Sequence, residues 1–263
     1  MGKLDGKVAI VTGSSCGIGQ ATAVLFAEEG ASVIVHGRSS ESLQKTHNLL
    51  KSKGIPESRI LIVQGVIEDD KTCDDLINKT VQKFGKLDVL VNNAGICGKH
   101  GIDQNSMENF KYVFDVNLRS VVYLTQLAIP HLEKTNGNIV NVSSGGSIRA
   151  NPDAAFYCMT KAAMDHMTRC YSLLLADKGI RINTLNPGFT ATEFGVKMGM
   201  TLETYKEFRD AVTSAIVPMK RDGSSEEMAT SILFLATDAT YMTGANIFAD
   251  GGYVNFSPTP KLQ

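Results

Sequence analysis

A tyrosine and a lysine four residues apart, Tyr157 and Lys161, are the side chains of this sequence best suited to acid–base chemistry. On a helix this spacing places both side chains on one face, one turn apart. A free phenol has a pKa of about 10 and is a poor base at neutral pH, but a nearby fixed cation favours the phenolate and lowers that pKa. Tyr157 is therefore a candidate proton donor or acceptor for an alcohol or a carbonyl group. Alone, such a pair is usually part of a solvated helix face, so its meaning depends on its surroundings.

A glycine-rich turn near the N-terminus is the second chemical feature. The segment Thr12–Gly19 follows a run of apolar residues and opens a stretch with helical spacing. Glycines at such a point permit a tight turn and a close approach of the backbone, so a pyrophosphate can sit on the N-terminus of the helix. The position of this turn in the first strand–helix unit predicts a dinucleotide-binding site.

The elements that must position these groups alternate along the chain. Apolar and β-branched runs predict strands at Val8–Val11, Val33–Val35, Ile60–Val63, Val89–Val91, Ile139–Val142, Arg181–Leu185 and Asn246–Ala249. Segments with helical spacing lie between them, including long ones at about 107–132 and 155–175. Strands joined by helical crossovers pair in parallel and carry helices on both faces. The sequence therefore predicts a doubly wound α/β fold with about seven parallel strands, as a single domain over residues 1–263.

Several polar and glycine residues directly follow these predicted strands, namely Gly13, Asn92, Ser144 and Pro187. Parallel sheets bind their ligands at the carboxyl ends of the strands, near the point where the strand order reverses. We therefore expect these residues to gather at one edge of the sheet. Ser143 and Ser144 alone would more simply turn or cap the chain, and only the joint pattern gives them a chemical role.

Composition excludes several other classes of function. The 26 basic and 27 acidic residues give a formal net charge of −1, which argues against binding to nucleic acid or to an anionic membrane. Five cysteines without a C-x-x-C spacing indicate reduced thiols rather than a disulfide framework. The five histidines have no metal-ligand spacing, so we predict no metal site. Without a long apolar run or a signal peptide, the expected location is the cytoplasm.

In order along the chain, these motifs resemble those of the short-chain dehydrogenase/reductase family in its standard cytosolic form. The resemblance covers nearly the whole chain and implies a Rossmann-type fold. Its motifs are Thr12–Gly19, Asn92-Asn93-Ala94-Gly95, Asn117 within a helix, Asn141-Val142-Ser143-Ser144, Tyr157 to Lys161, and Pro187-Gly188 with Thr192. The match implies an oxidoreductase that transfers a hydride between a nicotinamide cofactor and a carbonyl or secondary alcohol.

The resemblance also implies the role of each catalytic residue. Tyr157 would be the proton donor or acceptor, and Ser144, thirteen residues before it, would hold the substrate oxygen. Lys161 would bind the nicotinamide ribose and lower the pKa of Tyr157. Asn117 would hold a water molecule that links Lys161 to solvent. The protein would supply position and electrostatics, because hydride passes directly between cofactor and carbon.

The same motifs indicate which residues contact the cofactor. These are Gly13, Ser15, Cys16, Gly17, Ile18, Gly19, Arg38, Ser39, Val66, Ile67, Asn93, Ala94, Gly95, Tyr157, Lys161, Pro187, Gly188, Thr190 and Thr192. Val66 is a departure, because relatives usually carry an aspartate there, beside the adenine.

The choice between NADP and NAD depends on the end of the second predicted strand. An acidic residue there would accept hydrogen bonds from the ribose 2′-hydroxyl of NAD and repel a 2′-phosphate. This chain instead has Gly37 followed by Arg38, a cation suited to a phosphate. The sequence favours NADP, with NAD as the alternative.

The substrate and the assembly are less determined by the sequence. We expect residues 96–102 and a substrate lid at about 189–219 to line the pocket, with Phe194, Val196, Met198 and Met200 as an apolar inner face. Steroids, small ketones, quinones and acyl thioesters all fit that description. The family habit suggests a homotetramer or homodimer. Two alternatives stay open: an NAD-preferring alcohol or hydroxysteroid-type dehydrogenase, and a non-catalytic dinucleotide-binding regulator.

Overall fold

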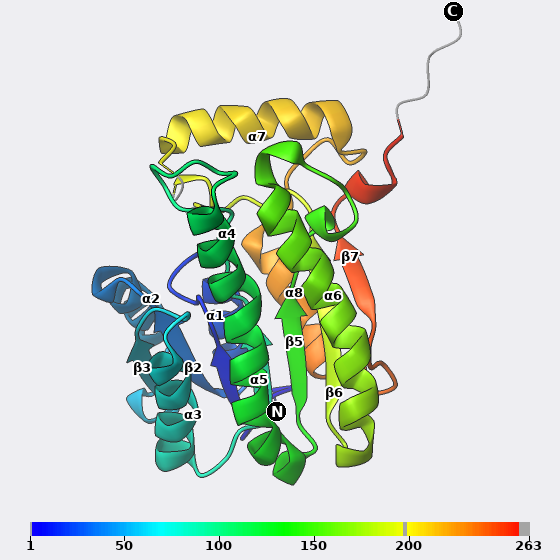
Figure 1. The fold of residues 1–263 in the computed structure, drawn as a ribbon. Helices are drawn as coiled ribbons and strands as arrows, with labels where there is room; N and C mark the ends of the chain where they lie inside the picture. The colour runs from blue at the N-terminus through cyan, green and yellow to red at the C-terminus, as the bar shows by residue number, and fades with distance from the viewer. Residues whose placement is uncertain (1, 197–198, 258–263) are drawn as a thin grey trace, which may run out of the picture.

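Seven parallel strands form one sheet in the order β3-β2-β1-β4-β5-β6-β7 (Figure 1). In this computed structural model, which describes residues 2–196 and 199–257, the strand bounds are β1 (Val8–Val11), β2 (Ser32–Gly37), β3 (Ile60–Gln64), β4 (Val89–Asn92), β5 (Asn138–Val142), β6 (Arg181–Pro187) and β7 (Asn246–Ala249). Val11 pairs with Val35 on one side and with Val91 on the other. The strand order thus reverses between β1 and β4, which is where sheets of this kind bind ligands.

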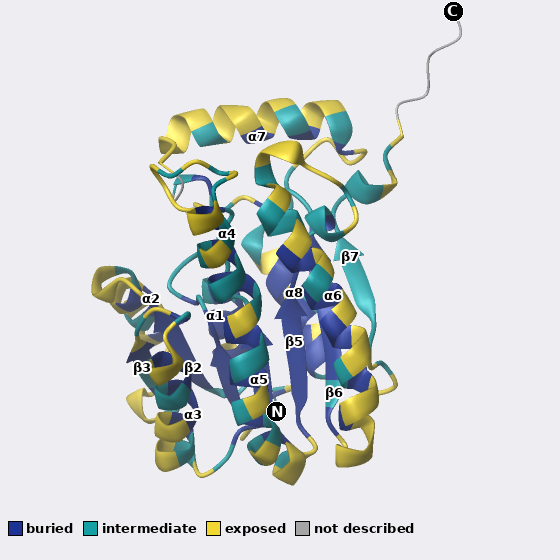
Figure 2. Cartoon of the chain, viewed as in Figure 1, coloured by how far each residue is buried: buried dark blue, intermediate teal, exposed yellow. Residues whose placement is uncertain are grey.

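Helices cover both faces of the sheet (Figure 1). Their bounds are α1 (Gly17–Glu28), α2 (Ser40–Ser52), α3 (Asp70–Phe84), α4 (Met107–Phe114), α5 (Ser120–Leu132), α6 (Ala155–Leu175), α7 (Leu202–Ile216) and α8 (Ser225–Ala236). Along β1, Ala9 and Val11 join the core with α1, α2 and α8, whereas Val8 and Ile10 join the core with α3, α5 and α6. This alternation follows from the two-residue period of a strand. Figure 2 shows the resulting buried sheet between helices with exposed outer faces.

The predicted fold class and the seven strands are confirmed, with boundaries that shift by at most two residues. Helix α6 has the predicted bounds. The predicted helix over 107–132 is instead interrupted, because residues 115–119 form a π turn between α4 and α5. Such turns insert one extra residue into a helix and are frequent at functional sites.

The sequence did not predict helix α7, which lies across the carboxyl edge of the sheet (Figure 1). Its buried residues are Arg209 and Thr213, both polar, whereas Leu202 and Phe208 are exposed. A helix is recognised in a sequence by an apolar stripe with a period of 3.6 residues, and α7 carries no such stripe toward the core. The glycines at 195 and 199 before it favoured an irregular segment instead.

None of the helices within 2–196 and 199–257 has the length and apolar character needed to cross a bilayer. The five cysteines all lie in this part of the chain and form no disulfide. Over the same residues, no group of three or more His, Cys, Asp or Glu side chains is arranged to hold a metal ion.

Candidate active site

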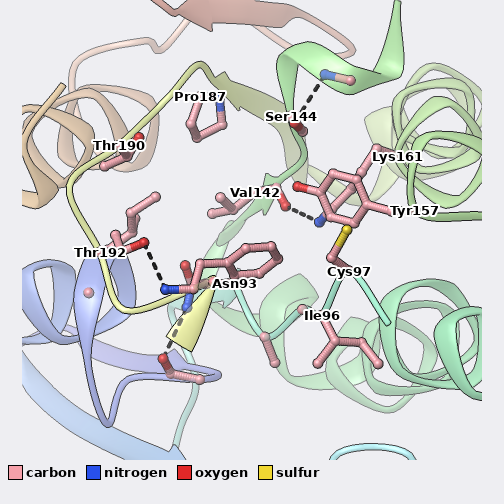
Figure 3. Close-up of a pocket in the computed structure, with 18 of the residues that line it drawn as sticks. Asn93, Ile96, Cys97, Val142, Ser144, Tyr157, Lys161, Pro187, Thr190 and Thr192 are labelled. Atoms are coloured by element: carbon pink, nitrogen blue, oxygen red, sulfur yellow. Dashed lines mark hydrogen bonds between the residues drawn. The ribbon is translucent and has the colours of Figure 1, made fainter. Parts of the chain in front are cut away.

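A cavity of about 470 Å³ opens at the carboxyl edge of the sheet (Figure 3). Most of the residues that the sequence indicated line it: Gly13, Ser15, Cys16, Gly17, Ile18, Arg38, Ile67, Asn93, Ala94, Gly95, Ser144, Tyr157, Lys161, Pro187, Gly188, Thr190 and Thr192. Gly19, Ser39, Val66 and Asn117 are outside this lining. Asn92 does not line the cavity either: it is buried in the sheet, where its amide donates a hydrogen bond to the side chain of Asn141 on β5.

The glycine-rich turn has the backbone shape that a phosphate cradle requires. Gly13 and Gly17 adopt φ values of +64° and +57°, which favour glycine. A Cβ on Gly19 would lie 2.4 Å from Nδ2 of Asn93, so this glycine serves packing rather than the cavity surface. The Asn93 amide in turn donates to the carbonyl oxygens of Thr12 (2.8 Å) and Gly13 (3.2 Å). The turn is thereby fixed beside the N-terminus of α1, where backbone N–H groups can bind an anion.

The two adjacent serines have different tasks in the structure. Ser143 is buried, and its Oγ donates to the backbone carbonyl of Lys161 at 3.1 Å, which ties β5 to α6. Ser144 is partly exposed toward the cavity, and its Oγ accepts a hydrogen bond from the N–H of Gly146 at 3.0 Å. Because that bond uses the acceptor side of the hydroxyl, the Ser144 proton can point toward a second partner.

Lys161 is a buried cation with a fixed position. Its Nζ donates to the carbonyl oxygen of Val142 at 2.8 Å and is 5.6 Å from the centroid of the Tyr157 ring (Figure 3). Burial lowers the pKa of Lys161 to about 8, and the carboxylate of Asp165 partly opposes this effect. An ammonium group has three protons, so two are left to bind other acceptors in the cavity.

Tyr157 is enclosed more tightly than the sequence suggested. Burial raises the pKa of its phenol well above the ordinary value, and a hydrogen bond with Ser144 acts in the opposite direction. In the free protein the phenol is therefore neutral at physiological pH, which is the form of a proton donor. Its ring packs at 6.0 Å, centroid to centroid, from the ring of Phe194.

Asn117 is fully buried at the centre of the π turn. Its side chain accepts from the N–H of Ile96 (2.9 Å) and donates to the carbonyl of Ile96 (2.8 Å) and to Thr160 (3.2 Å). A Cβ on Gly95 would be 3.5 Å from both Asn117 Oδ1 and Lys161 Nζ. Glycine at this position thus keeps open a small space that both polar atoms face.

Arg38 stands at the end of β2, where it lines the cavity. Its Nη1 donates to the hydroxyl of Tyr112 on α4 at 3.2 Å, so the guanidinium is held near the mouth. Ser39, which does not line the cavity, accepts from the N–H of Ser42 and caps the start of α2. The N-terminus of α2 and a guanidinium group thus lie side by side.

At the end of β3 the side chain of Val66 is exposed rather than turned into the cavity. The next two residues, Ile67 and Glu68, line the cavity instead. Glu68 was not identified from the sequence. It places a carboxylate two residues after the position where relatives usually carry an aspartate.

The outer half of the cavity contains further residues that the sequence did not indicate, among them Arg149, Cys158 and Tyr253. Tyr205 and Phe208 also line it, and both lie within the segment 189–219 that was expected to do so. Of the residues expected to form the pocket, Ile96, Cys97, Phe194 and Met200 line it, whereas Val196 does not, and Met198 is outside the described residues. Tyr253 follows β7 at the same sheet edge, and that position is the signal that could have identified it.

Comparisons with known proteins agree with this geometry. The family model described as enoyl-(acyl carrier protein) reductase matches residues 13–254. A 3-oxoacyl-[acyl-carrier-protein] reductase of Thermotoga maritima is 40% identical over 96% of this chain and 99% of its own.

Two solved structures have the same fold over nearly their whole length. A short-chain dehydrogenase/reductase of Caenorhabditis elegans, solved with cofactor, has a TM-score of 0.94 and 37% identity, and covers 97% of each chain. An L-sorbose reductase of Gluconobacter frateurii, solved with NADPH and L-sorbose, has a TM-score of 0.87 and 30% identity, and covers 97% of this chain and 98% of its own. The chain belongs to the short-chain dehydrogenase/reductase family, whose members are NAD(P)-dependent oxidoreductases of alcohol and carbonyl groups.

Proposed function

We propose that the protein reduces a ketone with NADPH, or oxidises the matching secondary alcohol with NADP, and that Tyr157 is its general acid and base. The observation that carries this proposal is the meeting of Ser144, Tyr157 and Lys161 in one cavity with the glycine-rich turn and Arg38. A non-catalytic dinucleotide-binding protein would need the glycine-rich turn but not the phenol of Tyr157 and the buried ammonium of Lys161 beside it.

The residues present fit a dinucleotide. Gly13 and Gly17 leave the backbone bare beside the N-terminus of α1, which suits a pyrophosphate. Glu68 and Ile67 would flank the adenine, and the two remaining protons of Lys161 would bind the hydroxyls of the nicotinamide ribose. Pro187, Gly188, Thr190 and Thr192 would enclose the nicotinamide end. When bound, this cofactor supplies or accepts the hydride.

The proton is handled by the chain itself. In the reduction, Tyr157 donates the proton to the carbonyl oxygen, and Ser144 holds that oxygen with its hydroxyl proton. In the oxidation, Tyr157 must lose its proton, and the Lys161 cation favours this by stabilising the phenolate. Asn117 Oδ1 and Lys161 Nζ both face the space above Gly95, where a water molecule could carry the replacement proton.

Two features of the adenosine end favour NADP. Arg38 can form charge-assisted hydrogen bonds with a 2′-phosphate, and the N-terminus of α2 next to it attracts anions. The end of β2 offers no carboxylate to repel the phosphate, since Gly37 and Arg38 occupy those positions. The L-sorbose reductase solved with NADPH is a relative of the same fold.

We also propose that residues 189–219 form a substrate lid on the single domain. Thr190, Thr192 and Phe194 reach into the cavity from this segment, and α7 lies over it. Met200 and Phe208 line the cavity yet stay exposed, which suits a segment that closes further on a ligand. A homodimeric or homotetrameric assembly and a cytoplasmic location stay predictions of the sequence.

Replacing Tyr157 with phenylalanine should remove turnover and leave the fold intact. The ring still packs against Phe194, but the proton path is deleted. We expect kcat to fall by about 10²–10⁴, with a cofactor Kd within a few-fold of wild type. Tyr241→Phe, at a fully exposed tyrosine outside the cavity, is the control. A Tyr157→Phe variant that retains more than about a tenth of wild-type kcat would contradict the role of Tyr157.

The buried ammonium of Lys161 should make folding stability depend on pH. Its pKa is about 8 in the folded protein and 10.5 ordinarily, so the unfolded chain binds more protons between these values. Stability therefore rises with pH through this window, by at most about 3 kcal/mol. Lys161→Met abolishes this contribution, and exposed Lys134→Met does not. Urea unfolding at pH 7.5 and 10 should show that the free energy of unfolding of the wild type rises relative to that of Lys161→Met. If the difference in unfolding free energy between the two proteins is the same at both pH values, Lys161 is not a buried cation.

Replacing Arg38 with alanine should weaken the binding of NADPH much more than the binding of NADH. Loss of a charge-assisted contact costs roughly 1.5–3 kcal/mol, which is on the order of ten- to a hundredfold in Kd. Arg169→Ala, at an exposed arginine outside the cavity, is the control. Gly37→Asp is a less clean test, because the new Cβ would be 2.8 Å from Ser15 Oγ. If Arg38→Ala weakens the binding of both cofactors equally, or if the wild type prefers NADH, the proposed preference for NADP is wrong and the NAD alternative replaces it.

The lid proposal predicts that cofactor and substrate protect the segment from proteolysis. Lys206 is an exposed trypsin site on α7. Cleavage after Lys206 should slow severalfold in the presence of NADPH and a slowly reacting ketone, while cleavage at exposed Lys134 stays constant. Equal rates of cleavage at Lys206 in the free and liganded protein would contradict a closing lid.

A further inference from the structure

The outer half of the cavity has walls of aromatic rings from three separate segments. Phe189 and Phe194 come from the loop after β6, Tyr205 and Phe208 from α7, and Tyr253 from the chain after β7. Phe194 packs at 6.0 Å from the Tyr157 ring, and Phe189 packs edge-on at 5.2 Å from Tyr253. The apolar wall therefore begins directly beside the phenol that handles the proton.

Tyr205 is built into this wall by a close backbone contact. A Cβ on Gly195 would be 2.2 Å from Cδ2 of the Tyr205 ring, so the ring lies flat on the backbone there. The guanidinium carbon of Arg209 is 5.1 Å from the centroid of the same ring, and Arg209 pairs with Asp222 in a nearly buried ion pair. Helix α7 is thus held so that its aromatic residues face the cavity.

Arg149 is a cation of this outer half, and part of its hydrogen-bonding capacity is already used. Its Nη1 donates to the carbonyl oxygens of Tyr253 (2.5 Å) and Phe256 (3.3 Å), and its guanidinium carbon is 4.5 Å from the centroid of the Tyr253 ring. The nearby rim residue Asp153 is an exposed acid. A carboxylate or phosphate on the substrate could reach only the remaining guanidinium protons of Arg149, and it would face the like charges of Asp153 and Glu193 in the cavity lining.

We propose that the substrate is a neutral ketone, or its secondary alcohol, whose body is an apolar ring system. Aromatic walls supply a large contact area to such a body, with Ser144 and Tyr157 as the polar groups that fix its oxygen. A polyhydroxylated substrate would lose water from each hydroxyl and would find few partners on these walls, because ring faces make up most of their surface and polar groups such as the Tyr205 and Tyr253 hydroxyls are few. The same argument disfavours an anionic acyl thioester, although relatives of this chain include a sugar reductase and an acyl-carrier-protein reductase.

This inference rests on the proposed function and uses the same balanced step. The carbonyl carbon gains the hydride, the oxygen gains the Tyr157 proton, and the ketone becomes a secondary alcohol as the cofactor is oxidised. The only new element is the group attached to the carbonyl, which the walls select.

The first test compares three carbonyl compounds with the wild-type enzyme and NADPH: 2-tetralone, L-sorbose and acetoacetyl-coenzyme A. We expect kcat/KM for 2-tetralone to exceed both others by about a hundredfold or more, since each unpaired hydroxyl or displaced charge costs roughly tenfold. A higher kcat/KM for L-sorbose or the thioester overturns the inference and leaves the proposed reductase intact. If none of the three is reduced by an enzyme that binds NADPH, both proposals fail.

The second test asks whether the aromatic wall causes this preference. Phe208 is 48% exposed, so Phe208→Ala removes part of the wall without emptying a core. We expect kcat/KM to fall about tenfold for 2-tetralone, mainly through KM, and to fall much less for 2-butanone, which is too small to reach α7. Phe234→Ala, at a 42% exposed phenylalanine outside the cavity, should change neither. Equal losses for the two ketones, or none, would overturn the role of the wall.

Discussion

The ammonium of Lys161, buried at the junction of α6 with the end of β5, is the constraint on which the rest of the site depends. The Lys161 ammonium donates a hydrogen bond to the carbonyl of Val142, and the hydroxyl of Ser143 donates one to the backbone carbonyl of Lys161. Together these two bonds fix α6 against the sheet. Burying a cation is costly, and the cost is visible in its lowered pKa. Two neighbouring features shape the space beside this charge. Gly95 leaves a small gap next to the ammonium, and the π turn brings Asn117 to the same gap.

In the function that we propose, the chemistry and the selection of substrate belong to different parts of the fold. Ser144, Tyr157 and Lys161 stand on a strand end and a long helix, which hold side chains within narrow limits. The aromatic walls stand on a loop, on a helix that packs mainly through a buried ion pair, and on the chain after β7. Changes in these outer segments would alter the substrate without disturbing the proposed proton donor, as expected where loops on a rigid scaffold carry specificity.

Local pattern was enough to predict the sheet and the residues along its carboxyl edge. The central strands β1, β2, β4 and β5 are short runs with side chains buried on both faces, and a residue that follows a parallel strand must reach that edge. Both Ser143 and Ser144 line the cavity, but Ser143 is buried and bonded to the backbone of Lys161, whereas Ser144 is partly exposed, and its substrate-holding role stays a prediction of the resemblance. The free-protein pKa of Tyr157 was not foreseen, because it depends on how completely tertiary packing encloses the phenol.

The features that escaped prediction are those that depend on distant contacts. The π turn accompanies hydrogen bonds from Asn117 to Ile96, a residue 21 positions away in the chain. Helix α7 has no apolar stripe toward the core and is held by the pairing of Arg209 with Asp222. Arg149 and Tyr253 meet across 104 residues. The position of Glu68 depends on how the chain turns after β3, which composition alone does not determine.

The pH dependence of alcohol oxidation tests the central claim most directly, because it reports on the phenol and its cation together. With saturating NADP, the rate should rise with pH as a single base ionises. Relative to the wild type, Lys161→Met should shift the apparent pKa upward by more than one unit at a lower maximal rate, because it removes the cation that favours the phenolate. If both proteins give the same apparent pKa, Lys161 does not activate Tyr157, and this account of the site is wrong.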